Sequence, residues 1–246
     1  MQAFSLLHLH FALIPPRQLW IACALTVVFA AIARGMRGVS RSGAIAGAAV
    51  CFVLYIGAGA GGFLALVSVF GLAWLTTRCG YQKKQTLGTA ERRDGRTASQ
   101  VLANLGIAAA CAVLHMATGK AVYLLALSAA LAEAAGDTAS SEIGQASAAS
   151  PRLITTWQPV PPGTDGGISV PGTIAGILTA LVVSAVSTAG GLLPWNKIWI
   201  PALAGVCGTL ADSCLGALLE RRGLLNNDLV NFLSTAVAAT LALLLG

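Results

Sequence analysis

Residues 121–145 read AVYLLALSAALAEAAGDTASSEIGQ, an almost wholly apolar segment that runs into two carboxylates and three hydroxyls. The apolar part has the composition of a membrane-crossing helix, and ionisable groups at the edge of the hydrocarbon are costly and usually retained for function. On a period of 3.6 residues, Glu133, Asp137 and Ser141 share one face. The stretch therefore predicts a membrane helix that continues to about Ala146 and carries chemistry at its polar end.

The rest of the chain has the same apolar character. Its 246 residues are 56% hydrophobic and 10% charged, and the mean hydropathy is +0.78, which excludes an ordinary soluble domain. We predict one all-α integral-membrane domain over residues 1–246, a polytopic helix bundle with about eight transmembrane helices. The predicted helices are residues 19–33, 43–60, 63–77, 101–118, 121–135, 170–190, 198–219 and 230–246. The apolar segment 1–16 is expected to lie at the membrane interface.

The distribution of cations predicts the orientation. If the N-terminus lies outside, Arg17, Lys120 and Lys197 are the three of the 15 Lys and Arg residues that fall outside with it. This bias follows the positive-inside rule, so loops 78–98 and 136–169 are expected in the cytoplasm as the catalytic loops. It also explains the pI of 9.3 without a nucleic-acid partner. The six cysteines show no CxxC spacing and are expected to be small core residues rather than disulfides or metal ligands.

Carboxylates at the ends of three predicted helices indicate a metal site. Asp137 and Glu142 end one helix, Asp212 lies on a glycine-rich face of another, and Asp228 opens the last. Oxygen ligands of this kind suit Mg²⁺, which bridges a few protein carboxylates to substrate phosphates. We therefore predict Mg²⁺ as cofactor, Asp137, Glu142 and Asp212 as catalytic residues, and these three with Asp228 as metal ligands.

Other polar residues are candidates for binding nucleotide and phosphate. Cations neutralise phosphate charge, amides and hydroxyls orient phosphate or base, and adjacent glycines let backbone amides approach a phosphate closely. The candidates are Lys83, Lys84, Arg92, Arg93, Arg96, Asn104, Thr138, Ser141, Arg152, Asp165, Gly166, Gly167, Ser213, Asn227 and Asn231.

Each of these patterns has a structural alternative. Small residues at spacings of three and four are also ordinary helix packing in membranes, and a basic loop also anchors to anionic lipid. GTDGGIS at residues 163–169 reads equally well as a turn, and the preceding PPG suggests a hairpin. GAIAG at 43–47 and GTIAG at 172–176 suggest either an internal duplication or close packing.

Several motifs together carry a resemblance to a known family. They are QVLAN at residues 100–104, GDTASSEIGQ at 136–145, PRLITT at 151–156, GTDGGISVPGT at 163–173 and LADSCLGALLERRGLLNNDLVNFLSTAVAA at 210–239. In this order they resemble the integral-membrane domain-of-unknown-function 92 family, which includes phytyl-phosphate kinase and transmembrane protein 19. The resemblance covers approximately residue 34 to the C-terminus. It implies transfer of a nucleotide γ-phosphoryl group to an isoprenyl monophosphate, and distant similarity to CTP-dependent polyprenol kinases and CDP-lipid synthases favours CTP over another nucleoside triphosphate.

Two other functions remain open at this point. A CDP-lipid-forming cytidylyltransferase would attack the α-phosphate of CTP and release pyrophosphate. A small-molecule or lipid transporter would need polar groups along a pathway, whereas the segments 43–60 and 63–77 carry almost none in their middles. Membrane lipid is an expected partner in all three cases, and the sequence leaves the oligomeric state open.

Overall fold

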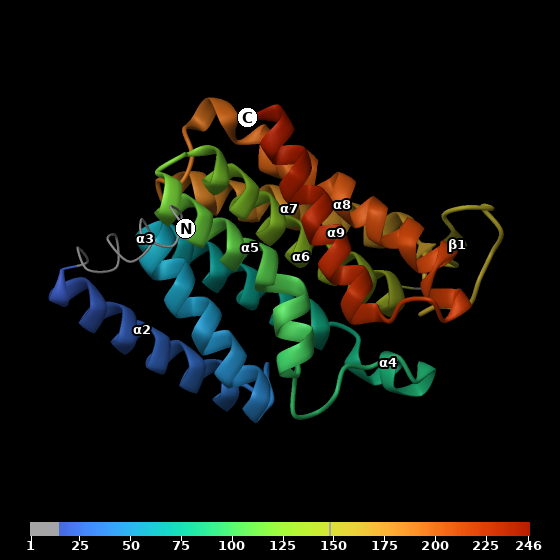
Figure 1. Ribbon diagram of the computed structural model, residues 1–246. Coiled ribbons are helices and arrows are strands. Elements are labelled where there is room, and N and C mark those ends of the chain that lie inside the picture. The colour runs from blue at the N-terminus through green and yellow to red at the C-terminus, as the bar shows by residue number, and fades with distance from the viewer. Residues whose placement is uncertain (1–14, 148) are drawn as a thin grey trace.

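The computed structural model describes residues 15–147 and 149–246 and is a helix bundle with one short hairpin (Figure 1). Seven of its helices are long and apolar enough to cross a membrane, so the predicted all-α membrane bundle is confirmed. The expected interfacial segment 1–16 lies almost entirely outside the described residues. The helices are α2 (Pro16–Gly35), α3 (Arg41–Arg78), α4 (Tyr81–Leu87), α5 (Ala98–Thr118), α6 (Val122–Ala146), α7 (Val170–Ala189), η1 (Trp195–Lys197), α8 (Trp199–Leu218), η2 (Glu220–Arg222) and α9 (Asn227–Leu245).

Helix α3 combines two of the eight predicted membrane segments. Its 38 residues are interrupted at Gly59, whose φ of 65° and ψ of −158° are open to glycine but strained for other residues. The chain turns back at Gly59, so the end of α3 returns to its beginning. The carbonyl of Met36, just before α3, accepts hydrogen bonds from Trp74 Nε1 at 3.1 Å and from Arg78 Nη2 at 3.0 Å, both near the end of α3. Figure 1 shows the two halves side by side. All the predicted segments are therefore present.

Helix α6 is the centre of the bundle. It packs against α3, α5, α7, α8 and α9. In the most apolar stretch of α6, 78% of the residues are buried, whereas in that of α2 the buried share is 17%. Small residues bring α7 close: a Cβ on Gly176 would lie 3.0 Å from the Gly136 carbonyl oxygen, and one on Gly172 would lie 2.5 Å from that of Ser140. The glycines at the contact between α6 and α7 therefore serve close packing, and the polar residues of α6 contact other elements.

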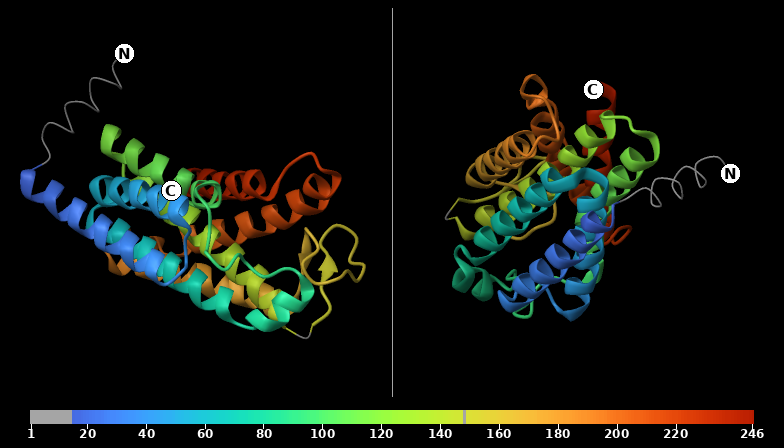
Figure 2. Two further views of the ribbon diagram at one scale, coloured as in Figure 1. Left: turned by 90° about the horizontal axis from the view of Figure 1, so that it is seen from below. Right: turned by 90° about the vertical axis from the view of Figure 1, so that its left-hand side faces the viewer.

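The connections divide the molecule into two ends. One end, called here the loop-rich end, holds the α2–α3 turn, the connection from α3 to α5, the α6–α7 hairpin and the α8–α9 turn (Figure 2). Lys83 of α4 reaches the Ala146 carbonyl at the end of α6, and Ser99 of α5 donates to Asp228 of α9. At the opposite end, Lys197 Nζ lies 2.9 Å from the Gly246 carbonyl oxygen. The polar connections therefore converge on one face of the bundle.

The α6–α7 connection contains the hairpin suggested by its turn residues. Strands β1 (Arg152–Leu153) and β2 (Gly167–Ile168) pair antiparallel, with Arg152 opposite Ile168. A Cβ on Gly166 would lie 2.5 Å from Ala217 Cβ, so the hairpin rests directly on the end of α8.

The expectation that all six cysteines are core residues is wrong for two of them. All are free, and Cys51 and Cys111 are buried, but Cys23 and Cys79 are exposed. Cys23 lies on α2, which packs mainly against α3 and is the least buried of the membrane helices in the described chain. Lipid is as apolar as a protein core, so an apolar membrane segment does not require burial of each small residue.

Candidate functional site

A polar cavity of about 210 Å³ opens among α5, α6, α9 and the connection that precedes α5. It is called here the polar pocket. Three helices bring together residues that are far apart in the chain. Eight of its lining residues are candidates from the sequence, namely Arg96, Asn104, Asp137, Thr138, Ser141, Glu142, Asn227 and Asn231, and the others are Thr89, Glu91, Gln100 and Gln145.

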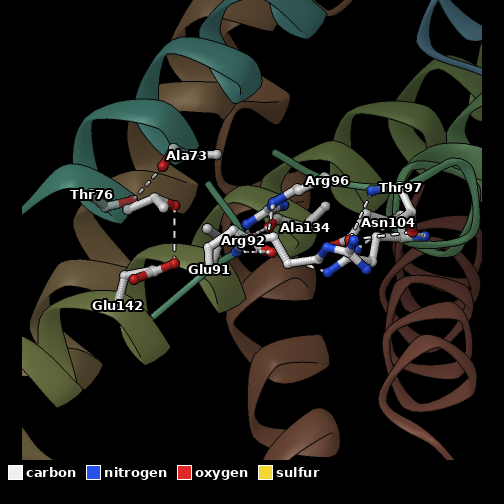
Figure 3. Close-up of polar contacts among 12 residues, drawn as sticks. Ala73, Thr76, Glu91, Arg92, Arg96, Thr97, Asn104, Ala134 and Glu142 are labelled. Atoms are coloured by element: carbon white, nitrogen blue, oxygen red, sulfur yellow. Dashed lines mark hydrogen bonds and ion pairs between the residues drawn. The ribbon is translucent and has the colours of Figure 1, made fainter. Parts of the chain in front are cut away.

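Arg96 is the cation of this pocket among the residues that the structure describes. Its backbone is fixed to the α2–α3 turn: the amide donates to the Gly38 carbonyl at 3.1 Å, and the carbonyl accepts from the Ser40 amide at 2.9 Å. Its side chain donates to Thr138 Oγ1 at 3.2 Å and lies 3.8 Å from the Glu91 carboxylate. Figure 3 shows Glu91, Arg96 and Asn104 grouped beside the helix that carries Ala134. A guanidinium held from both sides is a preorganised binder for phosphate.

Two carboxylates from different helices meet beside this arginine. Asp137 of α6, in the pocket lining, and Asp212 of α8, outside that lining, lie close enough for their charges to interact, and Arg96 is near Asp137. The Ser234 hydroxyl of α9 donates to Asp212 Oδ2 at 3.2 Å. A pair of partly buried carboxyls with one nearby arginine favours a bound cation or a shared proton.

Glu133, one turn before Asp137, extends this acidic group into the bundle. Its side chain is 1% exposed, and its Oε1 atom has no hydrogen-bond partner in the described structure. Room for it comes from Gly208 of α8, where a Cβ would lie 2.5 Å from Glu133 Cγ. A buried carboxyl oxygen without a partner is costly, so Glu133 is suited to a ligand that enters next to Asp137 and Asp212.

The acidic side chains beside the polar pocket could supply part of the ligands of a Mg²⁺ ion. Among the described residues, no three His, Cys, Asp or Glu side chains form a complete metal site. Mg²⁺ usually keeps several waters and binds one or two protein carboxylates plus substrate phosphates. Asp137 and Asp212, with the unpartnered oxygen of Glu133 behind them, offer such an incomplete set of oxygen ligands.

Glu142 has a different environment from the other two predicted catalytic carboxylates. It forms an ion pair with Lys84, and Thr77 donates to its Oε1 at 2.9 Å. Lys84 is fully buried and also donates to the Thr77 carbonyl at 2.8 Å. Figure 3 shows Glu142 facing the end of α3 beside Thr76. The geometry thus gives Glu142 and Lys84 a role in joining α6 to α3 and α4.

The remaining candidates are not gathered in the polar pocket. Each has a local contact that accounts for its position or lies on the surface. Lys83 donates to the Ala146 and Ser147 carbonyls, Arg92 pairs with Asp94 at 3.5 Å, Arg93 is exposed, Arg152 donates to the Trp157 carbonyl at 2.8 Å, Asp228 accepts from Ser99, Ser213 donates to the Thr209 carbonyl at 3.3 Å, and Asp165, Gly166 and Gly167 lie on the hairpin beside α8.

Sequence reasoning missed Thr89, Glu91, Gln100 and Gln145 as pocket residues. Glu91 is near Arg96 and accepts from Gln100 Nε2 at 3.3 Å, and Gln100 also forms the capping box that starts α5 with Thr97. The TxxQ spacing before an apolar segment was the available signal, because it fixes where the helix begins. It does not reveal that the cap faces a cavity.

Comparisons with known proteins also show an integral membrane protein over most of the chain. The family model described as "Integral membrane protein DUF92" matches residues 24–239. An uncharacterized membrane protein of Methanocaldococcus jannaschii is 35% identical over 233 residues, covering 93% of this chain and 94% of that protein. An uncharacterized membrane protein of Synechocystis is 32% identical over 196 residues, or 78% and 76% of the two chains.

A plant protein is also similar. The protein named "Protein VTE6, chloroplastic" of Arabidopsis thaliana is 29% identical over 217 residues, covering 85% of this chain and 65% of that protein. No solved structure matches the chain.

Proposed function

Because the chain belongs to the integral membrane protein family DUF92, we propose that it is a membrane kinase acting on an isoprenyl monophosphate. It would transfer the γ-phosphoryl group of a nucleoside triphosphate, with CTP favoured, and give the lipid diphosphate. The motifs shared with a family that includes phytyl-phosphate kinase support this proposal.

The observation that carries the proposal is the meeting of Arg96, Thr138 and the Asp137–Asp212 pair at the loop-rich end of the bundle. Phosphoryl transfer depends mainly on positioning and on stabilising negative charge, which a fixed arginine and a nearby cation site provide. Asn104, Asn227 and Asn231 add amide groups to the same pocket and would orient the phosphates or the base.

The reaction needs no nucleophile from the protein. An anionic oxygen of the acceptor phosphate forms a bond to the γ-phosphorus, and the bond from that phosphorus to the β,γ-bridging oxygen breaks. The nucleoside diphosphate leaves with the electron pair. Arg96 would hold the phosphoryl oxygens in line, and the Thr138 hydroxyl would keep the guanidinium in place.

We assign the metal site to Asp137 and Asp212, with Glu133 next to them. A bound Mg²⁺ supplies neutralisation of the triphosphate charge and orientation of its oxygens. The pocket would face the cytoplasm, where nucleotide is available, which agrees with the positive-inside bias of the loops.

A labelling experiment tests the reaction. Purified protein is incubated with Mg²⁺, a twenty-carbon isoprenyl monophosphate, and CTP labelled on either the γ- or the α-phosphate. We expect label from the γ-phosphate alone in a lipid diphosphate, with CDP as second product. Label from the α-phosphate in the lipid, with pyrophosphate release, would establish a cytidylyltransferase instead. Absence of transfer from CTP, ATP, GTP and UTP to a folded preparation would contradict the kinase.

The acidic pair gives a second test of the same function. Asp137→Asn and Asp212→Asn are each expected to lower turnover by about 10²-fold or more, since each removes a charge at the phosphoryl-transfer site. The double variant should lose little more, because residues that act as one unit are non-additive. Asp94→Asn is the matched control, because Asp94 is exposed, pairs with Arg92 and lines neither the polar pocket nor any other described cavity. Independent, multiplicative losses would mean that the two carboxylates do not hold one ligand.

A further inference from the structure

A second and larger cavity, of about 490 Å³, lies between α2, α3 and α5. It is called here the apolar cavity. Its walls are mainly aliphatic and aromatic side chains, among them Phe29 of α2, Leu66, Val69 and Phe70 of α3, and Leu105 of α5. A volume of this size lies within the usual range for a pocket that holds one small ligand.

The charged residues of the apolar cavity are confined to one end. Arg37, Arg78, Arg92, Arg93 and Arg96 line it, and all five belong to the loop-rich end. From Arg78 back to Leu66 along α3 is roughly 18 Å at 1.5 Å per residue, so the apolar part reaches well into the bundle. Glu91 is the acidic residue in the described lining, and it is near Arg96 and hydrogen-bonded to Gln100. The cavity therefore has a strongly cationic mouth and an apolar interior.

Arg78 is a cation at this mouth whose charge is not neutralised by a carboxylate of the described residues. Its guanidinium lies 4.3 Å from the centroid of the Trp74 ring and donates to the Met36 carbonyl at 3.0 Å. No carboxylate pairs with it in the described part of the chain. A cation held by a ring and a neutral carbonyl keeps its full charge for an anionic ligand.

The two cavities share a wall. Glu91, Arg96, Gln100 and Asn104 line both of them. A phosphate at the cationic mouth would therefore lie across Arg96 from the Asp137–Thr138 side of the polar pocket. This is the relation that a phosphate acceptor needs to a nucleotide donor.

We propose that the apolar cavity is the acceptor site, that it takes a lipid with a single apolar chain and a terminal phosphate, and that Gly47 sets the space for the chain. The proposal rests on the kinase function and names the part of the molecule that binds its lipid. The chain lies toward Phe29 and Leu66, and the phosphate lies among the arginines. Two-chain lipids such as phosphatidic acid are excluded by the size of the cavity.

Gly47 provides a direct way to fill the cavity. It lines the cavity, and a Cβ at this position would meet no atom within 4 Å. By contrast Gly43, one turn earlier, is packed against the Arg96 carbonyl and tolerates no side chain. Gly47→Leu therefore places a side chain in the lipid path without disturbing the backbone. Gly71→Leu is the matched control: it lies on the same helix with no atom within 4 Å of its Cβ and is not part of the cavity lining.

Binding can be measured without turnover, because Trp74 lies in the lining. Trp20, Trp157, Trp195 and Trp199 are replaced by Phe, and the fluorescence of Trp74 is titrated with a twenty-carbon isoprenyl monophosphate in the absence of nucleotide. We expect saturable binding, with Kd raised about tenfold or more by Gly47→Leu through overpacking and unchanged by Gly71→Leu. The uncharged alcohol of the same chain and phosphatidic acid should both bind more weakly.

Each result has a defined meaning. Equal binding by Gly47→Leu and the parent protein overturns the proposal, as does equal binding of phosphatidic acid. If Gly47→Leu does not fold, Ala30→Leu on the α2 wall decides in its place. If lipid phosphate binding behaves as expected but no phosphoryl transfer occurs, the apolar cavity stands as a lipid-phosphate binding site and the kinase function fails.

Discussion

At the scale of single residues, the buried ion pair between Lys84 and Glu142 accounts for two candidates from the sequence, Glu142 predicted as catalytic and Lys84 predicted to bind phosphate. Lys84 has no exposed side-chain surface, and its other partners are the carbonyls of Thr76 and Thr77. A buried charge is tolerated when it is paired and fully hydrogen-bonded. The pair therefore holds α4 and the end of α3 against α6, directly beside the polar pocket.

This role predicts an effect on stability rather than on chemistry. Glu142→Gln or Lys84→Met alone should lower the free energy of unfolding by about 3–5 kcal/mol, because each leaves an uncompensated buried charge. The double variant should recover part of the loss. Thermal unfolding in detergent measures this, with Lys83→Met as control, since Lys83 is exposed. A Glu142→Gln protein of normal stability that has lost Mg²⁺-dependent turnover would return Glu142 to the metal site.

The same pair shows which parts of the site a sequence can predict. Asp137 and Ser141 were predicted to share one face of a helix with Glu133 because polar residues recur there at helical spacing, and both line the polar pocket. The partner of Glu142 lies 58 residues earlier in the chain, and nothing local distinguishes Lys84 from the exposed Lys83. Periodicity identifies the faces of helices, but only tertiary packing decides which charges meet.

At the scale of elements, the connection between α4 and α5 positions Arg96. Gly95 has a φ of 86°, and a Cβ there would lie 2.5 Å from the Gly38 carbonyl carbon and the Val39 nitrogen. The close approach allows Arg96 to bond Gly38 and Ser40 through its backbone. Glycine at this position is therefore required for two separate reasons, conformation and space.

Gly95→Ala is expected to reduce phosphoryl transfer by about tenfold or more by shifting Arg96, while the helix content stays normal. Gly88→Ala separates the two reasons, because Gly88 has a φ of 73° but no atom within 4 Å of its Cβ. It should show backbone strain with little loss of activity. Turnover and circular dichroism on both variants make the comparison. Equal activity losses would mean that strain, and not the position of Arg96, controls the rate.

Element boundaries also show where sequence reasoning ends. The segments 43–60 and 63–77 were recognised from hydropathy, because composition and length suffice to identify a membrane span. Hydropathy does not show that the chain reverses between them at Gly59. Nor does it show that Trp74 and Arg78, near the end of the second segment, donate hydrogen bonds to the Met36 carbonyl before the first. The apolar cavity is invisible in the sequence for the same reason, since its walls come from α2, α3 and α5.

At the scale of the whole molecule, both cavities draw their charged residues from the loop-rich end. The apolar cavity extends from that end between helices, and the polar pocket shares its wall. A lipid phosphate from the membrane and a nucleotide from water would thus meet at one face of the bundle, as the proposed function requires.

This arrangement makes the orientation of the bundle decisive. In a variant without the six native cysteines, a cysteine at Gln82 or Thr164 should react with an impermeant thiol reagent from the cytoplasmic side alone. The reason is that, of the 15 Lys and Arg residues, all except Arg17, Lys120 and Lys197 lie at the loop-rich end, and cation-rich loops remain inside. A cysteine at Asn196, an exposed residue of η1 at the opposite end, is the control and should react from outside. Labelling at position 164 from outside would place the polar pocket on the side of the membrane opposite to cytoplasmic nucleotide. That result would contradict the kinase proposal without contradicting the helix bundle.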